Sequence, residues 1–136
     1  MKIFLPIVFF LICSFKVYGH GTIIIKGVEH EEGKIDVKIY KDKETFLKES
    51  LAVEVIRKKP TKDETIIPLS KIHEGKFAIV VYHDEDGNGE LKTGLFWRPK
   101  EGFAFSNNYM PKGPPKFKKA LISLEHGVPI TIKLNY

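Results

Sequence analysis

The sequence predicts an all-β protein, a two-sheet antiparallel β-sandwich of about seven strands with one short helical turn. Three observations predict this fold. Several short segments are rich in β-branched residues, turn signals containing glycine separate them, and no helical pattern alternates with them. A chain of 136 residues has the length of one domain.

The first two predicted strands open the folded part of the chain. Residues 22–28 form a β-branched run, and residues 34–40 alternate strictly between apolar and charged or polar side chains. This alternation indicates a half-buried strand. The polar segment 29–33 ends in glycine, which favours a hairpin turn between the two strands.

The middle of the chain holds the helical candidate and two further strands. Residues 42–50 predict one or two helical turns, and residues 51–56 predict a third strand. Residues 64–70 predict a fourth strand. Pro68 places that strand at a sheet edge, because proline cannot donate a hydrogen bond to a ladder.

The second half of the chain predicts three more strands. Residues 76–82 are strongly apolar and predict a central strand that is buried on both faces. Residues 116–124 predict the next strand. Residues 128–136 alternate, which predicts a last strand with one face in water.

The N-terminal segment has the pattern of an export signal. Lys2 precedes an apolar run over residues 3–15, and Gly19 ends a suitable signal-peptidase site. The run is shorter than the ~20 residues of a transmembrane helix. We therefore predict a signal peptide over residues 1–19 and a mature domain over residues 20–136. The expected location is the periplasm, the outer-membrane periphery or the outside of the cell, with no integral membrane span after cleavage.

Cysteine usage and charge exclude several classes of protein. The only cysteine, Cys13, lies in the predicted signal, so the mature chain has no disulfide, thiol nucleophile or cysteine metal site. Loss of Lys2 and Lys16 leaves 20 of the 22 basic residues against 17 acidic ones, a net charge of +3. This is an ordinary surface charge and gives no sign of nucleic-acid binding.

The residue types of hydrolases are present without their spacing. His83, Asp84 and Ser106 show no nucleophile elbow. Gly87 and Gly89 lack the strand, loop and helix context of a phosphate-binding loop. We therefore predict a non-enzymatic protein.

The irregular segment 83–108 is the predicted functional loop. Asp84, Asp86 and Asn88, followed by Gly89, have the spacing of the first half of a calcium loop. Oxygen atoms at these positions can converge on one hard cation, and the glycine permits the sharp turn. The spacing therefore predicts a candidate Ca²⁺ site.

The second half of this calcium pattern is different. Glu90 offers a backbone carbonyl at the next ligand position, but no bidentate glutamate follows at the expected distance. Glu101, from the same segment, is the candidate for the missing carboxylate. The alternative is a tight turn at Gly87 and Gly89, in which Asp84 only caps the bend.

The same segment is rich in aromatic and amide side chains. The candidate ligand-binding residues are His83, Trp97, Phe103, Phe105, Ser106, Asn107 and Asn108. Exposed rings that stack on sugars, with Asn107 and Asn108 as hydrogen-bond donors, would suit a carbohydrate-binding module. In the alternative, the rings fold inward and form a small satellite core.

The N-terminus of the mature chain offers a further metal ligand. If cleavage follows Gly19, His20 presents an amine together with an imidazole, which can chelate copper, and a second histidine such as His83 would complete the site. Cleavage after Gly21 would remove His20.

The loop also resembles a known family. The run from His83 to Gly89, together with residues 99–103 and 105–108, is similar to the hallmark of the small exported proteins grouped as domain of unknown function 2141. The resemblance implies export and a sandwich similar to transthyretin-like or carboxypeptidase-regulatory domains, and it implies no activity. Lys92 departs from the hallmark at a position where the family usually has aspartate, which removes a possible ligand.

These observations lead us to expect an exported binding or accessory module whose loop is ordered by Ca²⁺ or another hard cation. Two alternatives stay open. One is a metal-free carbohydrate-binding module that uses the loop aromatics, and the other is a structural envelope protein whose loop is merely packed. The expected partner is a cell-envelope protein or a glycan, and not a nucleic acid.

Overall fold

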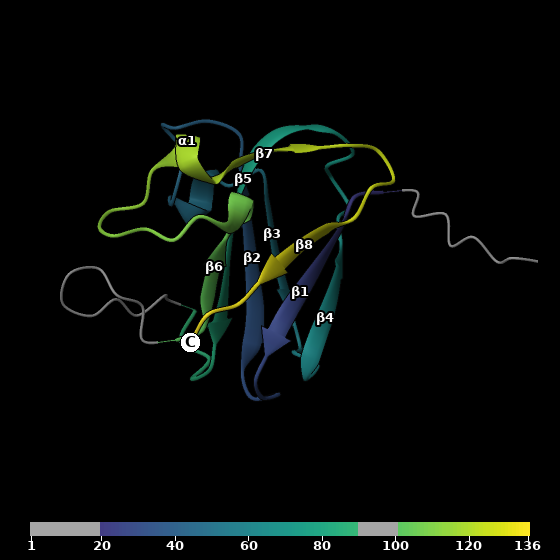
Figure 1. The fold of residues 1–136 in the computed structure, drawn as a ribbon, viewed down its shortest axis with the longest axis vertical. Coiled ribbons are helices and arrows are strands. Elements are labelled where there is room, and N and C mark those ends of the chain that lie inside the picture. Colours follow the sequence, from purple (N-terminus) through teal and green to yellow (C-terminus); the bar gives the residue numbers. More distant parts are fainter. Residues whose placement is uncertain (1–19, 90–100) are drawn as a thin grey trace, which may run out of the picture.

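The computed structural model describes residues 20–89 and 101–136, and these residues form two β-sheets (Figure 1). The smaller sheet has the strand order β4-β1-β8. The larger sheet has the order β3-β2-β5-β6, and β7 pairs with the first part of β5. The predicted all-β, two-sheet sandwich is confirmed. The elements are β1 (Thr22–Val28), β2 (Lys34–Tyr40), η1 (Glu49–Leu51), β3 (Glu54–Lys58), β4 (Asp63–Pro68), β5 (Gly75–Asp84), β6 (Phe103–Phe105), η3 (Ser106–Asn108), α1 (Phe117–Ala120), β7 (Leu121–Leu124) and β8 (Ile130–Lys133).

Alternating apolar residues of both sheets build the main core. The smaller sheet contributes side chains such as Ile25 and Ile132, and the larger sheet contributes Val37 and Ile79. All four side chains are buried. Their regular spacing in the sequence is the reason that β1 and β2 match their predicted bounds, because every second side chain must face this core.

The central strand β5 is buried on both faces, as predicted. Phe77, Ile79 and Val81 belong to the main core. Ala78 and Val80 point to the opposite face, where they join a second apolar cluster. The strand is ten residues long and extends through Asp84, two residues beyond its predicted end.

The second cluster explains why one prediction for local structure was wrong. Residues 116–120 were predicted as strand, yet Phe117–Ala120 forms the short helix α1. Ala120 is buried in the second cluster, and the Phe117 ring packs edge-on against Phe46 at a centroid distance of 5.7 Å. Packing against the second apolar cluster on β5 therefore overrides the local strand preference of this segment.

The predicted helix at residues 42–50 is a turn followed by the 3-10 helix η1. The Thr45 N–H donates to Asp42 Oδ1 at 3.0 Å, and the Lys48 N–H donates to the Thr45 carbonyl at 2.9 Å. Leu47 has a φ of 66°, which ends any right-handed helix at that point. The third strand accordingly begins at Glu54, three residues later than predicted.

Four connections pass from one sheet to the other, and one of them lies where the sequence predicted a hairpin turn. The predicted hairpin at residues 29–33 is wrong, because β1 lies in the smaller sheet and β2 in the larger one. The β3–β4, β4–β5 and β7–β8 connections also pass from one sheet to the other. Glycine and polar residues indicate that the chain reverses its direction, but they do not indicate which sheet the next strand joins.

The last strand corrects the expectation of a wholly antiparallel sandwich. β8 runs parallel to β1, with Ile23 opposite Ile130 and Lys26 opposite Lys133. β4 lies on the other side of β1 and forms the opposite edge of this sheet, in agreement with the edge position predicted from Pro68. The strand β6 lies inside the segment that was predicted to be an irregular loop.

Among the described residues, no helix is long and apolar enough to cross a membrane.

Candidate metal centre

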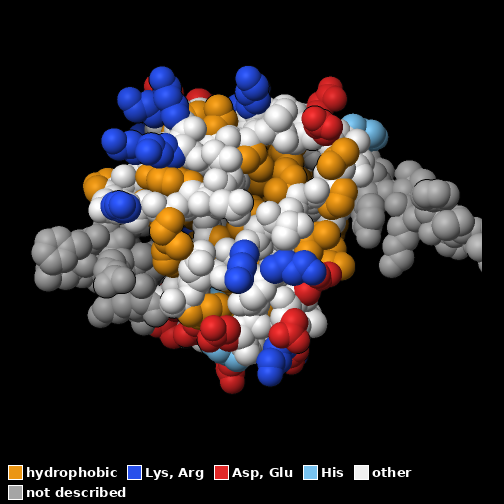
Figure 2. Space-filling view, viewed as in Figure 1, with side chains coloured by type: hydrophobic (Ala, Val, Ile, Leu, Met, Phe, Trp, Pro, Cys, Tyr) orange, Lys and Arg blue, Asp and Glu red, His pale blue; other side chains and the backbone are white. Residues whose placement is uncertain are grey.

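The candidate site lies at the end of β5, where the strand leaves the sheet. Asp84 is the last strand residue, it pairs with Lys34 of β2, and it is only 3% exposed. Acidic side chains gather along the lower edge of the molecule in Figure 2.

The Asp84 carboxylate holds the turn that follows it. Asp84 Oδ1 accepts a hydrogen bond from the Asn88 N–H at 3.1 Å, and Oδ2 accepts one from the Gly89 N–H at 2.8 Å. Gly87 and Gly89 have φ values of 72° and 76°, a conformation that glycine adopts without strain. Asp84 thus caps the bend as the turn interpretation expects. Each carboxylate oxygen still keeps a lone pair for another partner.

Asp86 and Asn88 form the exposed side of the turn. Asp86 Oδ1 accepts from the Asn88 N–H at 3.2 Å, and the Asn88 side-chain amide donates to Asp86 Oδ2 at 3.3 Å. These contacts place the Asp86 carboxylate against the turn that Asp84 closes.

Glu101 completes a group of three carboxylates. It is 6% exposed and precedes β6, so it reaches Asp84 from a different part of the chain. One carboxylate oxygen from each of Asp84, Asp86 and Glu101 lies within 4.8 Å of the other two. The structure therefore brings together three of the predicted ligands, including the substitute carboxylate.

The two buried carboxylates of this group, Asp84 and Glu101, have few partners among the described residues. Glu101 Oε1 accepts from the Glu85 N–H at 3.2 Å, whereas Oε2 is buried with no hydrogen-bond partner among the described residues. No described lysine or arginine forms an ion pair with Asp84 or Glu101. Two buried carboxylates side by side favour a bound cation, since an uncompensated buried charge is costly.

His83 is part of the interior and does not face a ligand. Its exposed fraction is 0%, its Nε2 lies 2.6 Å from the Glu32 carbonyl, and its Nδ1 lies 2.7 Å from the Tyr136 hydroxyl. A carbonyl only accepts, so Nε2 donates this hydrogen bond, and Nδ1 is hydrogen-bonded to the Tyr136 hydroxyl. His83 thus anchors the chain around the acidic turn.

The predicted copper pair of His20 and His83 is wrong. His83 lies near the end of β5, whereas His20 contacts His73, which precedes the start of the same strand. His83 instead stacks on His30 at a ring-centroid distance of 4.6 Å, and His30 Nε2 lies 3.3 Å from Glu85 Oε1.

Two glycines allow the backbone to approach this region closely. A Cβ atom on Gly33 would lie 1.9 Å from the Asp84 carbonyl oxygen. A Cβ atom on Gly102 would lie 2.4 Å from the Tyr136 ring, and the Gly102 carbonyl accepts from the His83 N–H at 2.6 Å. Only glycine fits at these two positions without a shift of its neighbours.

The predicted ligand-binding aromatics that the structure describes belong to the second apolar cluster. Phe105 is buried, and Phe103 and Tyr109 are partly buried against it. The alternative of an inward-facing satellite core therefore describes these rings. Trp97 and Glu90 lie outside the described residues.

Ser106 and the two asparagines have backbone roles. Ser106 is buried, and its hydroxyl accepts from the Ile79 N–H at 2.8 Å and donates to the Ala120 carbonyl. Asn107 and Asn108 are exposed and have positive φ angles of 62° and 48°. The Asn107 amide donates to the Lys119 carbonyl at 3.0 Å.

Sequence reasoning missed the contact of Tyr82 with the acidic turn. The Tyr82 hydroxyl donates to the Gly89 carbonyl at 2.9 Å and accepts from Lys38 Nζ at 2.7 Å. Alternation along β5 places Tyr82 on the face opposite the main core, but only the register of β2 and β5 shows that it lies opposite Asp36.

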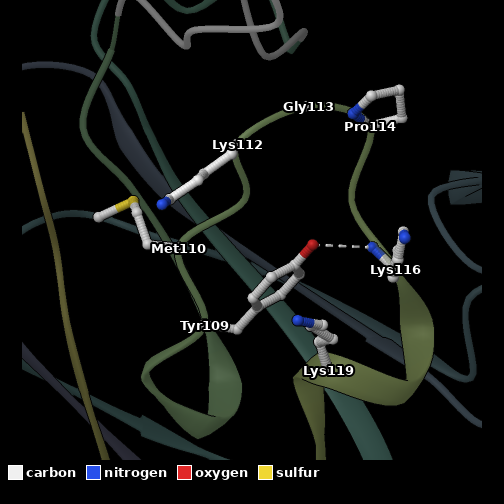
Figure 3. A pocket seen from close by; sticks show the side chains of 7 residues that line it. All are labelled: Tyr109, Met110, Lys112, Gly113, Pro114, Lys116 and Lys119. Carbon is white, nitrogen blue, oxygen red and sulfur yellow. Dashed lines mark hydrogen bonds between the residues drawn. The ribbon is translucent and has the colours of Figure 1, made fainter.

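A separate hollow lies near the second apolar cluster (Figure 3). Its volume is about 550 Å³, and Lys112, Lys116 and Lys119 contribute to its lining. The Tyr109 hydroxyl accepts a hydrogen bond from the Lys116 backbone N–H at 3.2 Å. The cationic lining suits an anionic group and differs in kind from the carboxylate site.

The fold and the site define an all-β sandwich protein with a cluster of three carboxylates at the end of its central strand. The chain belongs to the family described as "Uncharacterized protein conserved in bacteria (DUF2141)", whose model matches residues 23–131. The predicted family is confirmed, and the matched range contains the whole acidic turn. Comparisons with curated proteins and with solved structures give no match. The more specific transthyretin-like architecture stays a prediction.

Proposed function

We propose that this protein is an exported, non-enzymatic binding or accessory module in which a hard cation, Ca²⁺, orders the acidic loop. One observation carries the cation proposal: the carboxylates of Asp84, Asp86 and Glu101 converge while Glu101 Oε2 has no partner among the described residues. Ca²⁺ takes six to eight oxygen ligands, and carboxylates are the strongest of these.

The proposed cation has a structural role. Asp84 ends β5 and Glu101 precedes β6, so one ion bound to both ties together two points that are distant in sequence. It also offsets the charge of two buried carboxylates. Bound Ca²⁺ would therefore hold the loop in the form that meets a partner, for which a cell-envelope protein or a glycan is our candidate.

Two further parts of the proposal rest on other observations. The N-terminal pattern up to Gly19 supports export. The burial of His83 and Ser106, with both groups bonded to backbone or to Tyr136, supports a non-enzymatic role.

Thermal unfolding with Ca²⁺ and with chelator tests the cation. Binding to the folded form alone adds about 2.7 kcal/mol at a hundredfold excess over Kd, a rise in Tm on the order of 10 °C. Glu101→Gln keeps the shape of the side chain and removes its charge, so it should abolish the Ca²⁺ response. It should also raise the Tm measured in chelator, because one buried charge is gone.

The control for this test is Glu44→Gln, which neutralises an exposed carboxylate in the turn before η1. This variant should keep the full Ca²⁺ response. An unchanged Tm of the wild-type protein up to millimolar Ca²⁺ would reduce the site to a capped glycine turn.

The carbohydrate-binding alternative draws on a different place in the structure. Asn108 and Tyr109 line a hollow of about 150 Å³ together with Asn135. Glycan-array binding that persists in chelator and is lost in Asn108→Ala would favour this alternative. A structural envelope role predicts neither glycan binding nor a Ca²⁺ response.

A further inference from the structure

The five histidines of the chain lie in two groups, and one group lies far from the acidic turn. His20 precedes β1, His73 lies in the β4–β5 connection, and His126 lies in the β7–β8 connection. These three segments meet near the start of β5. Figure 1 shows the start of β1 beside the β7–β8 connection, and Figure 2 shows histidine side chains at two separate edges of the molecule. The other pair, His30 and His83, lies at the opposite end of β5.

The geometry of this histidine group is that of a metal-binding pair with a third ring nearby. His20 Nδ1 and His73 Nδ1 are 3.1 Å apart, although 53 residues separate them in the sequence. Two imidazole nitrogens bound to one ion with bonds of about 2.05 Å lie roughly 2.9–3.4 Å apart. The ring centroids of His73 and His126 are 6.3 Å apart, and the exposed side chain of His126 would have to turn toward the other two rings to reach the same ion.

The backbone holds these histidines in place. Gly21 is buried, and its carbonyl accepts from the Leu69 N–H at 2.8 Å. A Cβ atom on Gly21 would lie 3.4 Å from the Ile72 carbonyl oxygen, so Gly21, which follows His20, packs directly against Ile72, which precedes His73. The turn that carries His126 is closed by the Val128 N–H, which donates to the Glu125 carbonyl at 3.1 Å.

We propose that His20, His73 and His126 form a second metal site, which binds a late first-row transition-metal ion such as Zn²⁺ or Cu²⁺. Imidazole nitrogen is the ligand these ions prefer, whereas Ca²⁺ takes oxygen. The site is independent of the proposed cation site, because the ten residues of β5 separate the two by about 30 Å. Exposed rings from three separate segments leave positions on the ion open to water or to a ligand from outside.

Isothermal titration of the full chain, without an affinity tag, with Zn²⁺ and with Cu²⁺ tests the proposal. The N-terminus of the purified chain is first read from its intact mass, so that the presence of His20 is known. We expect one ion per chain. His73→Ala and His20→Ala should each weaken binding by more than about tenfold, or about 1.4 kcal/mol, and His126→Ala should weaken it less.

Two controls separate this site from the others. His30→Ala removes a histidine of the opposite group, and Asp84→Asn removes a carboxylate of the acidic turn. Both should leave Zn²⁺ and Cu²⁺ binding unchanged. His20 and His73 are exposed, so their variants should unfold at the wild-type Tm without metal, which excludes misfolding as the cause of lost binding. Absence of binding at micromolar Zn²⁺ and Cu²⁺, or its loss in His30→Ala, would overturn the proposal.

Discussion

Gly33 and Gly102 show how single residues control the packing around the acidic turn. At both positions an added Cβ atom would overlap a neighbour, the Asp84 carbonyl in one case and the Tyr136 ring in the other. Gly33 also has a φ of 66°, so a substitution there combines steric overlap with backbone strain. Gly102 has no such strain, and a change there isolates the steric effect.

Replacement of Gly102 by alanine should destabilise the fold. The Tyr136 ring must move away from the new Cβ atom, which disturbs its hydrogen bond to His83. Overpacking of this kind costs about 1–3 kcal/mol, measured as the free energy of unfolding in urea. Gly113→Ala is the matched control, because nothing lies within 4 Å of its Cβ position. Equal stability of the two variants would contradict the proposed packing role.

The charged face of β2, β3 and β5 shows how neighbouring strands set the environment of one carboxylate. Burial raises the pKa of Asp36, and the Tyr82 hydroxyl and the cations of Arg57 and Lys38 offset this only in part. Arg57 Nε lies 3.0 Å from Asp36 Oδ2, and Arg57 also pairs with Glu49. Tyr82 connects this face to the acidic turn through Gly89.

The raised pKa of Asp36 predicts a pH dependence of stability. The ordinary pKa is 3.8, so just above pH 3.8 the folded protein holds a proton that the unfolded chain has released. The unfolding free energy falls as pH rises wherever the folded state binds more protons. The stability of the wild-type protein relative to Asp36→Asn should therefore fall from pH 4 upward and level off above the folded pKa.

Urea titrations at a series of pH values measure this slope. Asp42→Asn is the control, because Asp42 is exposed and an asparagine at that position can still accept from the Thr45 N–H. If the unfolding free energies of the wild-type protein and of Asp36→Asn differ by the same amount at every pH, then Asp36 has the same pKa in the folded and the unfolded states.

At the scale of the whole molecule, one core joins the two sheets. Ile25 of β1 is fully buried in it, whereas Ile66 of β4 is 42% exposed on the outer face of the same sheet. The two residues are chemically identical and one strand apart. Truncation of each residue therefore changes strand propensity equally, and any difference in the loss of stability measures the effect of burial.

Ile25→Ala should lower the unfolding free energy by about 2–5 kcal/mol, since the cavity it leaves is enclosed by both sheets. Ile66→Ala should cost less than about 1 kcal/mol because its side chain already meets water. Denaturant unfolding measures both values. A similar loss in the two variants would be inconsistent with a core shared by the sheets.

Much of the fold was predictable because its causes are local. A β-branched run identified β1, alternation identified β2, a strongly apolar run identified the buried centre of β5, and Pro68 identified an edge strand. The spacing of Asp84 and Asp86, with Glu101 as the substitute ligand, also anticipated the carboxylate group. Side-chain periods and turn residues act within a few positions of the chain, so the sequence displays them directly.

The remaining features depend on contacts between distant segments. Three features belong here: β8 pairs in parallel with β1, the chain crosses repeatedly between the sheets, and residues 117–120 form the helix α1. Each depends on how distant segments pack on the two faces of β5. The same arrangement buries His83 and brings His20 to His73. The sequence by itself determined most of the strands, the acidic turn and the family. Only the tertiary structure decided the sheet pairing and the partners of the histidines, because the free energy of burial is shared among residues far apart in the chain.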